Sequence, residues 1–461
     1  MHIPENDLMV QIFTYGILSV IWIHLGAIVW SNYKNLNKME QQHHVPDELQ
    51  GTSYHPEAFG LARLYAYQTL TFRNKKTIVE GVILTCVILT NGIGVLWDYS
   101  ERTVALIKPY LPLKKSTSWP WLGIFFFTLC YTILERVILY LPELEEFEIE
   151  KYFGFSRASR KKLTKSFIKV SILKVILWPV YLTAFSWGLQ KLSKLIEDKS
   201  WTVLSLMGFS YWLLFPTLIV VVILANSKQV QPLPEGGLKT RIDSLADKVN
   251  FPKDCIFVLH STKAKNHPNA FHLKFLNFQR LIIFESLIEF KDTSNPETLH
   301  IQGKGLSDPQ VEAVIAHELG HYHLSHGFWG VTYLQLKTLL SYLLTMWLIQ
   351  YSVFYNVIGI STYGNNSYLI PGLIAADLFV VQYTSKFLDF LFAIFQRYTE
   401  TQADKYAVRL GYGHTLESAL VKLTMDNYIF PVDDAFYTVI NCTHPSMITR
   451  MRNIRKCMIS N

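Results

Sequence analysis

The sequence is poor in charged residues. Asp, Glu, Lys and Arg make up only 17% of its 461 residues, whereas soluble globular proteins carry about 25%. Half of the residues are hydrophobic, and Phe, Tyr and Trp together contribute 14%. This balance indicates long stretches in contact with lipid. The net charge of +7 comes without a Lys/Arg block or a nucleic-acid-binding motif, so we expect no nucleic-acid partner.

Cysteine is also scarce. The five cysteines are scattered and none forms a C-x-x-C pair: Cys86, Cys130, Cys255, Cys442 and Cys457. An odd number without regular spacing predicts neither a disulfide framework nor a thiolate zinc site.

Seven apolar stretches are long enough to cross a bilayer as helices, which takes about 20 residues. They cover residues 9–30, 78–97, 119–141, 167–190, 201–225, 329–360 and 368–395. The first has no basic segment before it and no small-residue cleavage site after it, so we interpret it as a retained span. The third, sixth and seventh contain ionisable residues, which should face the bundle interior or a water-filled cavity.

The loops between these stretches predict an orientation. Loops 31–77 and 142–166 carry six Lys and Arg residues each, whereas loops 98–118, 191–200 and 361–367 carry four, three and none. By the positive-inside rule the first two loops are cytosolic. The N-terminus then faces the lumen, and the polar segments near the middle and the end of the chain face the cytosol.

We therefore expect four regions. They are a five-helix membrane region (1–225), a polar insert (226–328), the sixth and seventh membrane helices (329–395) and a C-terminal segment (396–461). Within the insert, residues 233–250 predict a Pro/Gly-punctuated start and an amphipathic helix. Residues 255–260 and 279–285 are short runs typical of strands, which predict a small sheet.

The insert ends in a helix with a metal-binding pattern. Ser307 and Gln310 stand at capping-box spacing and predict the helix start. His317 and His321, four residues apart, share one face of this helix and can hold one ion from the same side. Glu318 stays close enough to act on a water at that ion, which is the arrangement of the H-E-x-x-H zinc proteases.

A catalytic zinc takes three protein ligands and keeps one position open. The best candidate for the third is Glu400, on a helix that follows the last apolar stretch. Asp404 lies one turn later on the same face and is suited to orient a ligand histidine. His323 and His326 lie off the ligand face and are interpreted as bystanders.

With these residues in place, the chain resembles the type I CAAX prenyl endopeptidases, which pair H-E-L-G-H with a later E-x-x-x-D. Further similar segments are Glu150–Phe155 (E-x-x-F-G-F), Leu233–Gly236 (L-P-E-G), Asn269–Phe271 (N-A-F) and Asn441–Pro445 (N-C-T-H-P) followed by Arg450. The resemblance runs from about residue 46 to the C-terminus. Cys442, Met447 and the absence of a glycine after Phe271 depart from the family pattern and bear on substrate preference.

The resemblance implies a seven-helix polytopic membrane protein around a large internal chamber, with a small α+β zinc protease domain at its cytosolic side. It implies one Zn²⁺ per chain, held by His317, His321 and Glu400, with Glu318 as general base and His444 at the developing oxyanion. Asn269, Ala270, Phe271 and Arg450 would bind substrate. The implied location is the endoplasmic reticulum membrane or the nuclear envelope, and a monomer is expected.

The function implied by this resemblance is cleavage of prenylated CaaX carboxyl-terminal segments, with removal of the last three residues after the prenylcysteine. Three alternatives stay open at this point. A membrane quality-control protease would use the same zinc chemistry on misfolded or translocation-stalled proteins. A seven-helix receptor or transporter would carry H-E-x-x-H by coincidence. A scaffold would keep the site without activity, although every residue that the chemistry needs is present.

Overall fold

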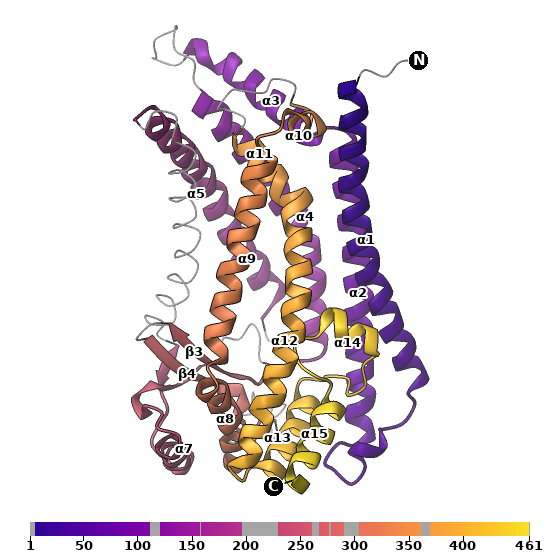
Figure 1. The fold of residues 1–461 in the computed structure, drawn as a ribbon, viewed down its shortest axis with the longest axis vertical. Coiled ribbons are helices and arrows are strands. Elements are labelled where there is room, and N and C mark those ends of the chain that lie inside the picture. Colours follow the sequence, from indigo (N-terminus) through magenta and orange to yellow (C-terminus); the bar gives the residue numbers. More distant parts are fainter. Residues whose placement is uncertain are drawn as a thin grey trace.

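The computed structural model describes residues 5–110, 120–156, 158–195, 229–260, 267–275, 278–289, 304–360 and 369–460. Long helices run side by side along the longest axis of the molecule (Figure 1). They are α1 (Glu5–Gln41), α2 (Pro56–Leu89), α4 (Pro120–Tyr152), α5 (Arg160–Leu195), α9 (His326–Leu348) and α12 (Gln382–Arg409). The chain is therefore an α-helical bundle with the proportions of a polytopic membrane protein.

The two ends of the bundle differ. The N-terminus, α3 (Gly92–Ile107), α10 (Ser352–Val357) and α11 (Leu369–Ala376) lie at one end, and the C-terminus and the strands lie at the other (Figure 1). The strand end also holds the shorter helices α7 (Gly237–Lys248), α8 (Asp308–His323), α13 (Gly413–Asp426), α14 (Ala435–Asn441) and α15 (Met447–Ser460). Opposite ends for the N-terminus and the polar segments agree with the predicted orientation. The side that each end faces stays a prediction.

Within the described residues, four helices are apolar and long enough to cross a membrane: Asp7–Gln41, Trp121–Tyr152, Arg160–Gly188 and Leu369–Arg409. They coincide with the predicted stretches 9–30, 119–141, 167–190 and 368–395. The last is continuous from α11 through a π-helical turn, Asp377–Val381, into α12. Stretch 201–225 lies outside the described residues. The predicted count of seven spans and the chamber between them stay predictions.

Exposed aliphatic side chains follow the outer faces of these helices. Ile23 on α1, Val137 and Leu141 on α4, and Ile176 on α5 are all more than half exposed. Burying such surface against lipid tails is favourable, at about 25 cal/mol per Å² of apolar area removed from water. The outer faces thus fit a bilayer.

Two predicted spans are interrupted. Stretch 78–97 was expected to be one helix, but α2 and α3 meet at a break and are bent by 60°. Stretch 329–360 was expected to be continuous, but α9 ends at Leu348, and α10 follows as a separate short helix packed against α1. In the described chain α9 is not among the helices that are apolar and long enough to span by themselves.

A backbone contact between the two breaks explains both. Asn91 adopts a left-handed conformation with φ 53°, and Gly359 turns the chain after α10 with φ 81°. The Gly94 amide donates to the Ile358 carbonyl at 2.8 Å. A Cβ on Gly94 would stand 2.3 Å from the Gly359 carbonyl oxygen. The breaks after α2 and after α10 therefore lie where Gly94 and Gly359 allow the two backbones to come into contact.

Ionisable side chains along the long helices pair with each other across helices. Lys174 on α5 contacts Glu135 on α4 at 2.7 Å. Lys337 on α9 contacts Asp389 on α12 at 2.6 Å, and the Tyr333 hydroxyl donates to the same carboxylate at 2.6 Å. Pairing lowers the cost of a charge at membrane depth. These pairs thus tie α4 to α5 and α9 to α12.

The small sheet has the strand order β1-β2-β4-β3. Its strands are β1 (Val230–Pro232), β2 (Ile256–Leu259), β3 (Ala270–Phe275) and β4 (Phe278–Phe284). β2 and β4 are parallel, and β3 pairs with β4 in antiparallel register with Phe271 opposite Ile282. The strands predicted at 255–260 and 279–285 and the helix predicted after 233 are confirmed. Among the described strands β3 is at the edge of the sheet, next to β4 alone.

The buried apolar side chains form two clusters. One, at the strand end, joins the sheet, α7, α8, α13 and α15 to the first half of α2. The other, at the opposite end, joins α1, α3, α4, α10 and α11. Because the polar insert shares its core with the C-terminal helices, the strand end is one packed unit built from distant parts of the chain.

We predict that Gly94→Ala destabilises the protein, because its Cβ would overlap the Gly359 backbone. Overpacking of this kind costs about 1–3 kcal/mol. The melting temperature in detergent should fall relative to Gly60→Ala, a matched helical glycine in α2 whose Cβ would meet nothing within 4 Å. Equal melting temperatures for the two variants would contradict the contact.

Candidate metal centre

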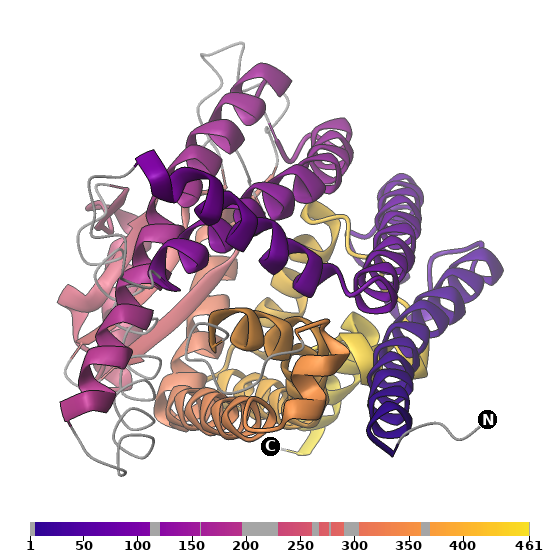
Figure 2. The same cartoon turned by 90° about the horizontal axis from the view of Figure 1, so that it is seen from above.

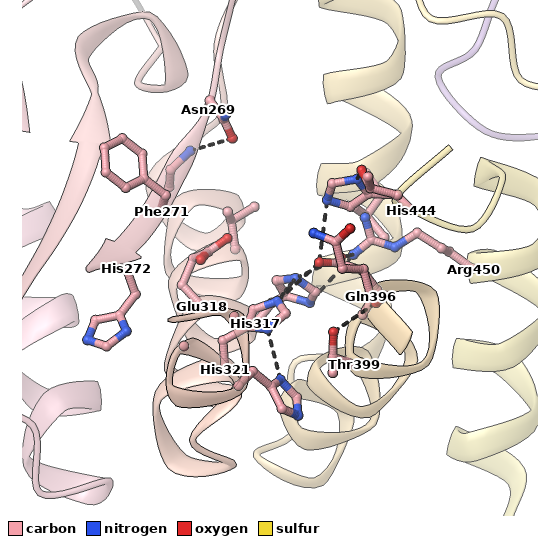
Figure 3. Close-up of a pocket in the computed structure, with 18 of the residues that line it drawn as sticks. Asn269, Phe271, His272, His317, Glu318, His321, Gln396, Thr399, His444 and Arg450 are labelled. Carbon is pink, nitrogen blue, oxygen red and sulfur yellow. Dashed lines mark hydrogen bonds and ion pairs between the residues drawn. The ribbon is translucent and has the colours of Figure 1, made fainter. Parts of the chain in front are cut away.

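Helix α8 presents two histidines to one point. Ser307 and Gln310 form the predicted capping box, with the Ser307 amide donating to Gln310 Oε1 at 3.1 Å. The helix then places His317 and His321 one turn apart, and their Nε2 atoms lie 3.2 Å from each other (Figure 3). The predicted helix start is confirmed, and its face directs both imidazoles into the same space.

Helix α12 brings a carboxylate to that space. Glu400 Oε2 lies 3.4 Å from His317 Nε2, and Glu400 Oε1 lies 3.3 Å from His321 Nε2. Ligand atoms around a tetrahedral ion with bonds of about 2.0–2.1 Å lie roughly 3.3–3.4 Å apart. Glu400 Oε2 is also buried without a hydrogen-bond partner. The three side chains therefore fit a tetrahedral cation with one position left open.

Close packing of α8 on α12 makes this meeting possible. Gly320, between the two histidines in the motif, faces α12. A Cβ at Gly320 would stand 3.1 Å from both the Ala403 Cα and the Tyr406 Cβ. These distances are shorter than ordinary van der Waals contact, so a side chain at this position would require Ala403 and Tyr406 to shift by a few tenths of an ångström.

Asp404 and Arg450 support the ligands from behind. Asp404 Oδ1 lies 2.9 Å from His317 Nδ1, the ring nitrogen that faces away from the other ligands. Arg450, on α15, donates to both Asp404 oxygens, from Nε at 2.9 Å and from Nη2 at 2.6 Å. Asp404 thus occupies the place predicted for it. Arg450 also lines the cavity, and its predicted contact with substrate stays a prediction.

His326 was interpreted as a bystander, yet its Nδ1 lies 2.9 Å from His321 Nδ1. The chain turns at Ser325, where φ is 55°, and α9 begins with His326 at the back of the ligand. Helical spacing counted through this turn as if the helix were continuous does not predict the contact between His326 and His321. His323 packs its ring on Tyr406 instead, with 5.0 Å between the ring centroids.

Glu318 faces a cavity of about 500 Å³ that the three candidate ligands also line. Burial raises the pKa of the Glu318 carboxyl, against the opposing effect of the His317 and His321 side chains. A carboxyl with a raised pKa is suited to accept and return a proton near neutral pH. Its place beside the candidate ligands is the one that the motif predicts.

Opposite walls of this cavity hold the other predicted residues (Figure 3). Asn269, Ala270 and Phe271 line the wall formed by the edge strand β3. His444 lies on the wall formed by the C-terminal segment, with Nε2 3.4 Å from Glu400 Oε1 and Nδ1 3.0 Å from the Thr443 hydroxyl. The His444 side chain is 61% exposed, but it stands in the cavity wall among other protein groups, and this partial desolvation lowers its pKa below the usual value, so its ring is neutral at neutral pH.

A polar network holds the start of β3, and it was not foreseen. His267 contacts the Glu150 carboxylate at 3.1 Å through Nε2 and the Asn427 amide oxygen at 3.0 Å through Nδ1. Glu150 also accepts from the Tyr65 hydroxyl at 2.7 Å. Phe155 stacks on the His267 ring at 4.1 Å. The Glu150–Phe155 motif therefore anchors the strand that carries Asn269.

Comparisons with known proteins agree along most of the chain. Residues 232–458 match peptidase family M48, and residues 32–222 match the CAAX prenyl protease N-terminal region of five membrane helices. The chain is 25% identical over 461 residues to a CAAX prenyl protease 1 homolog of Taenia solium, which covers 95% of this chain and 94% of that protein. It is 27% identical over 441 residues to the CAAX prenyl protease 1 homolog of Homo sapiens, covering 89% of each.

A solved structure shares the fold. The crystal structure of S. mikatae Ste24p superimposes with a TM-score of 0.75 at 22% identity, covering 98% of this chain and 100% of that one. This likeness shows that the two chains share one fold.

We predict that Asp404→Asn weakens metal binding about 10–100-fold, the usual effect of removing a carboxylate behind a ligand histidine. The amide would accept a weaker hydrogen bond from His317 and would leave Arg450 without its charge partner. Competition with a zinc chelator measures the affinity. Asp247→Asn, on the exposed face of α7, is the matched control. Equal affinity in the two variants would rule out this role for Asp404.

Proposed function

The chain belongs to the CAAX prenyl proteases of peptidase family M48, and from this we propose that it is a zinc-dependent membrane endopeptidase acting on prenylated CaaX carboxyl-terminal segments. The observation that carries the proposal is the tetrahedral spacing of His317 Nε2, His321 Nε2 and the Glu400 carboxylate beside Glu318. We further propose that cleavage removes the last three residues, after the prenylcysteine.

Zinc is the metal that this set of donors supports. Two imidazoles and one carboxylate in tetrahedral array are typical of catalytic zinc, which keeps one position open. When bound, Zn²⁺ supplies a Lewis acid that polarises the scissile carbonyl and makes water a stronger nucleophile. His317, His321 and Glu400 would hold it, and Asp404 and His326 would fix the orientation of the two imidazoles.

Glu318 would move the proton. Its carboxylate takes a proton from the attacking water and delivers it to the leaving amine. Proton transfer by a well-placed side chain contributes about 10²–10⁴-fold to the rate. Because burial raises the pKa of Glu318, the group can both take and release the proton within one turnover.

His444 would stabilise the oxyanion. The Thr443 hydroxyl can donate to His444 Nδ1, which leaves the proton of the neutral ring on Nε2. An Nε2–H aimed into the cavity can donate to the carbonyl oxygen as negative charge develops on it. A single donor of this kind is worth about 10²–10³ in kcat.

The edge strand β3 would hold the substrate backbone. Asn269, Ala270 and Phe271 line the cavity wall; Ala270 and Phe271 begin β3, which is at the edge of the sheet in the described part of the chain, and Asn269 directly precedes it. An extended peptide can add to such an edge through main-chain hydrogen bonds. The peptide would then run between β3 and the ligands, while a prenyl chain lies against apolar helix faces.

We also propose that the site faces the cytosol and that the protein resides as a monomer in the endoplasmic reticulum membrane or the nuclear envelope. The excess of Lys and Arg in loops 31–77 and 142–166 supports this orientation. The location rests on the family resemblance.

Glu318→Gln tests the mechanism. The amide keeps the size of the side chain but cannot take a proton, so the variant should retain one zinc per chain and lose at least about 100-fold in kcat on a farnesylated CaaX peptide. Metal analysis and peptide cleavage on the same sample give both values. Full cleavage by this variant would remove Glu318 from the mechanism.

Matched peptides in the same assay test the substrate. The native protein should cleave the farnesylated peptide and leave the unprenylated peptide nearly intact. Equal turnover of the two, together with turnover of an unfolded protein, would support a quality-control protease instead. Stoichiometric zinc without cleavage of any substrate would indicate an inactive scaffold.

A further inference from the structure

The position of His444 depends on its backbone. Its side chain is 61% exposed, and its polar contacts are with the neighbouring Thr443 hydroxyl and with Glu400. A surface imidazole with so few contacts can rotate away from the cavity. The backbone of residues 442–446 must therefore be held in place near the metal ligands by contacts that the His444 ring does not make.

The short helix α14 leads into this segment, and its two ends are fixed. At its start, the Asp434 carboxylate accepts from the Phe436 and Tyr437 amides at 2.9 and 3.2 Å. Near its end, the Asn441 amide donates to the Ser31 hydroxyl on α1 at 2.7 Å. Figure 1 shows α14 between α1 and α12. The Asp434 contacts cap α14 itself, and the Asn441 contact attaches the helix to α1. None of them reaches the ligand helix.

Arg397 makes that second attachment. Its Nη1 donates to the Cys442 carbonyl at 2.6 Å and to the Thr438 carbonyl at 3.2 Å. The Thr438 carbonyl lies in α14 and also accepts from the Cys442 amide at 3.2 Å, and Cys442 directly follows the helix. Arg397 therefore binds the carboxyl end of α14, where a cation is favourable. Burial raises the pKa of the Cys442 thiol to about 12, so this thiol is neutral and the carbonyl is the acceptor.

Arg397 and Glu400 share one face of α12, because residues three apart on a helix are neighbours. The same helical turn thus carries the third candidate ligand and the group that holds the chain two residues before His444. We propose that Arg397 is a positioning residue that sets His444 over the metal site. This inference rests on the proposed function, because it assigns Arg397 to the oxyanion donor of that reaction.

A double-mutant cycle tests the coupling. Arg397→Gln should lower kcat on the farnesylated peptide at least tenfold while KM and zinc content stay near native values. His444→Ala should lower kcat by about 10²–10³. The double variant should be no slower than His444→Ala alone, because Arg397 acts only through His444. Arg397→Lys keeps a cation and should recover part of the rate, and Arg409→Gln, at the exposed end of α12, is the control.

Hydrogen exchange gives a readout that does not depend on activity. Amides of residues 438–446 should exchange faster in Arg397→Gln than in the native protein or in His444→Ala. Two results would overturn the inference. One is a kcat loss in the double variant equal to the product of the two single losses, and the other is an unchanged rate of amide exchange at residues 438–446 in Arg397→Gln. If His444→Ala keeps full kcat, the proposed role of His444 fails, and exchange alone decides whether Arg397 holds the segment. If Arg397→Gln does not fold, the same cycle and exchange comparison use Arg397→Lys.

Discussion

The close approach of α8 and α12 at Gly320 is the constraint on which the site depends. His317 and His321 come from one helix and Glu400 from another, about eighty residues later in the sequence. Gly320 lets the two helices approach closely enough for these donor atoms to reach tetrahedral spacing. A Cβ at Gly320 would lie 3.1 Å from the Ala403 Cα on α12. A close backbone contact fixes the distance between two helices better than flexible side chains do, because closely packed interiors contain few voids into which atoms could move.

The rest of the site follows from α12. This helix runs from the long bundle into the strand end, so the ligand Glu400 is continuous with a candidate membrane span. Asp404, one turn later, contacts His317 and is itself held by Arg450 from α15. Arg397, one turn earlier, holds the end of α14. Three successive turns of α12 therefore carry Arg397, Glu400 and Asp404. Arg397 holds the end of α14, Glu400 is the candidate ligand, and Asp404 orients His317 of α8.

The sequence was sufficient where the signal is local. The pattern from Ser307 to His321 predicted a capped helix with two histidines on one face, because helical spacing and capping depend only on neighbouring residues. Glu400 and Asp404 lie on a second helix and were chosen as candidates because the metal needs a third ligand, and the family resemblance then agreed with that choice. Positions set by contacts between distant backbones were missed. Nothing near Gly94 predicts that it meets Gly359, and so two spans appeared continuous.

His326 and Arg397 were missed for related reasons. The turn at Ser325 breaks the helical phase, so spacing alone did not predict the contact between His326 and His321. Arg397 donates to backbone carbonyl groups. Because every residue has a carbonyl, the residue types in the sequence do not identify these partners. Side chains that bind backbone rather than other side chains are difficult to find without coordinates.

The central claim is that one zinc ion is held by His317, His321 and Glu400. X-ray absorption at the zinc edge of the purified protein, with metal analysis of the native chain and of Glu400→Ala, tests it most directly. We predict one zinc per native chain, with nitrogen and oxygen neighbours at about 2.0–2.2 Å, and loss of most zinc in the variant. Sulfur neighbours, or full zinc occupancy in Glu400→Ala, would contradict it.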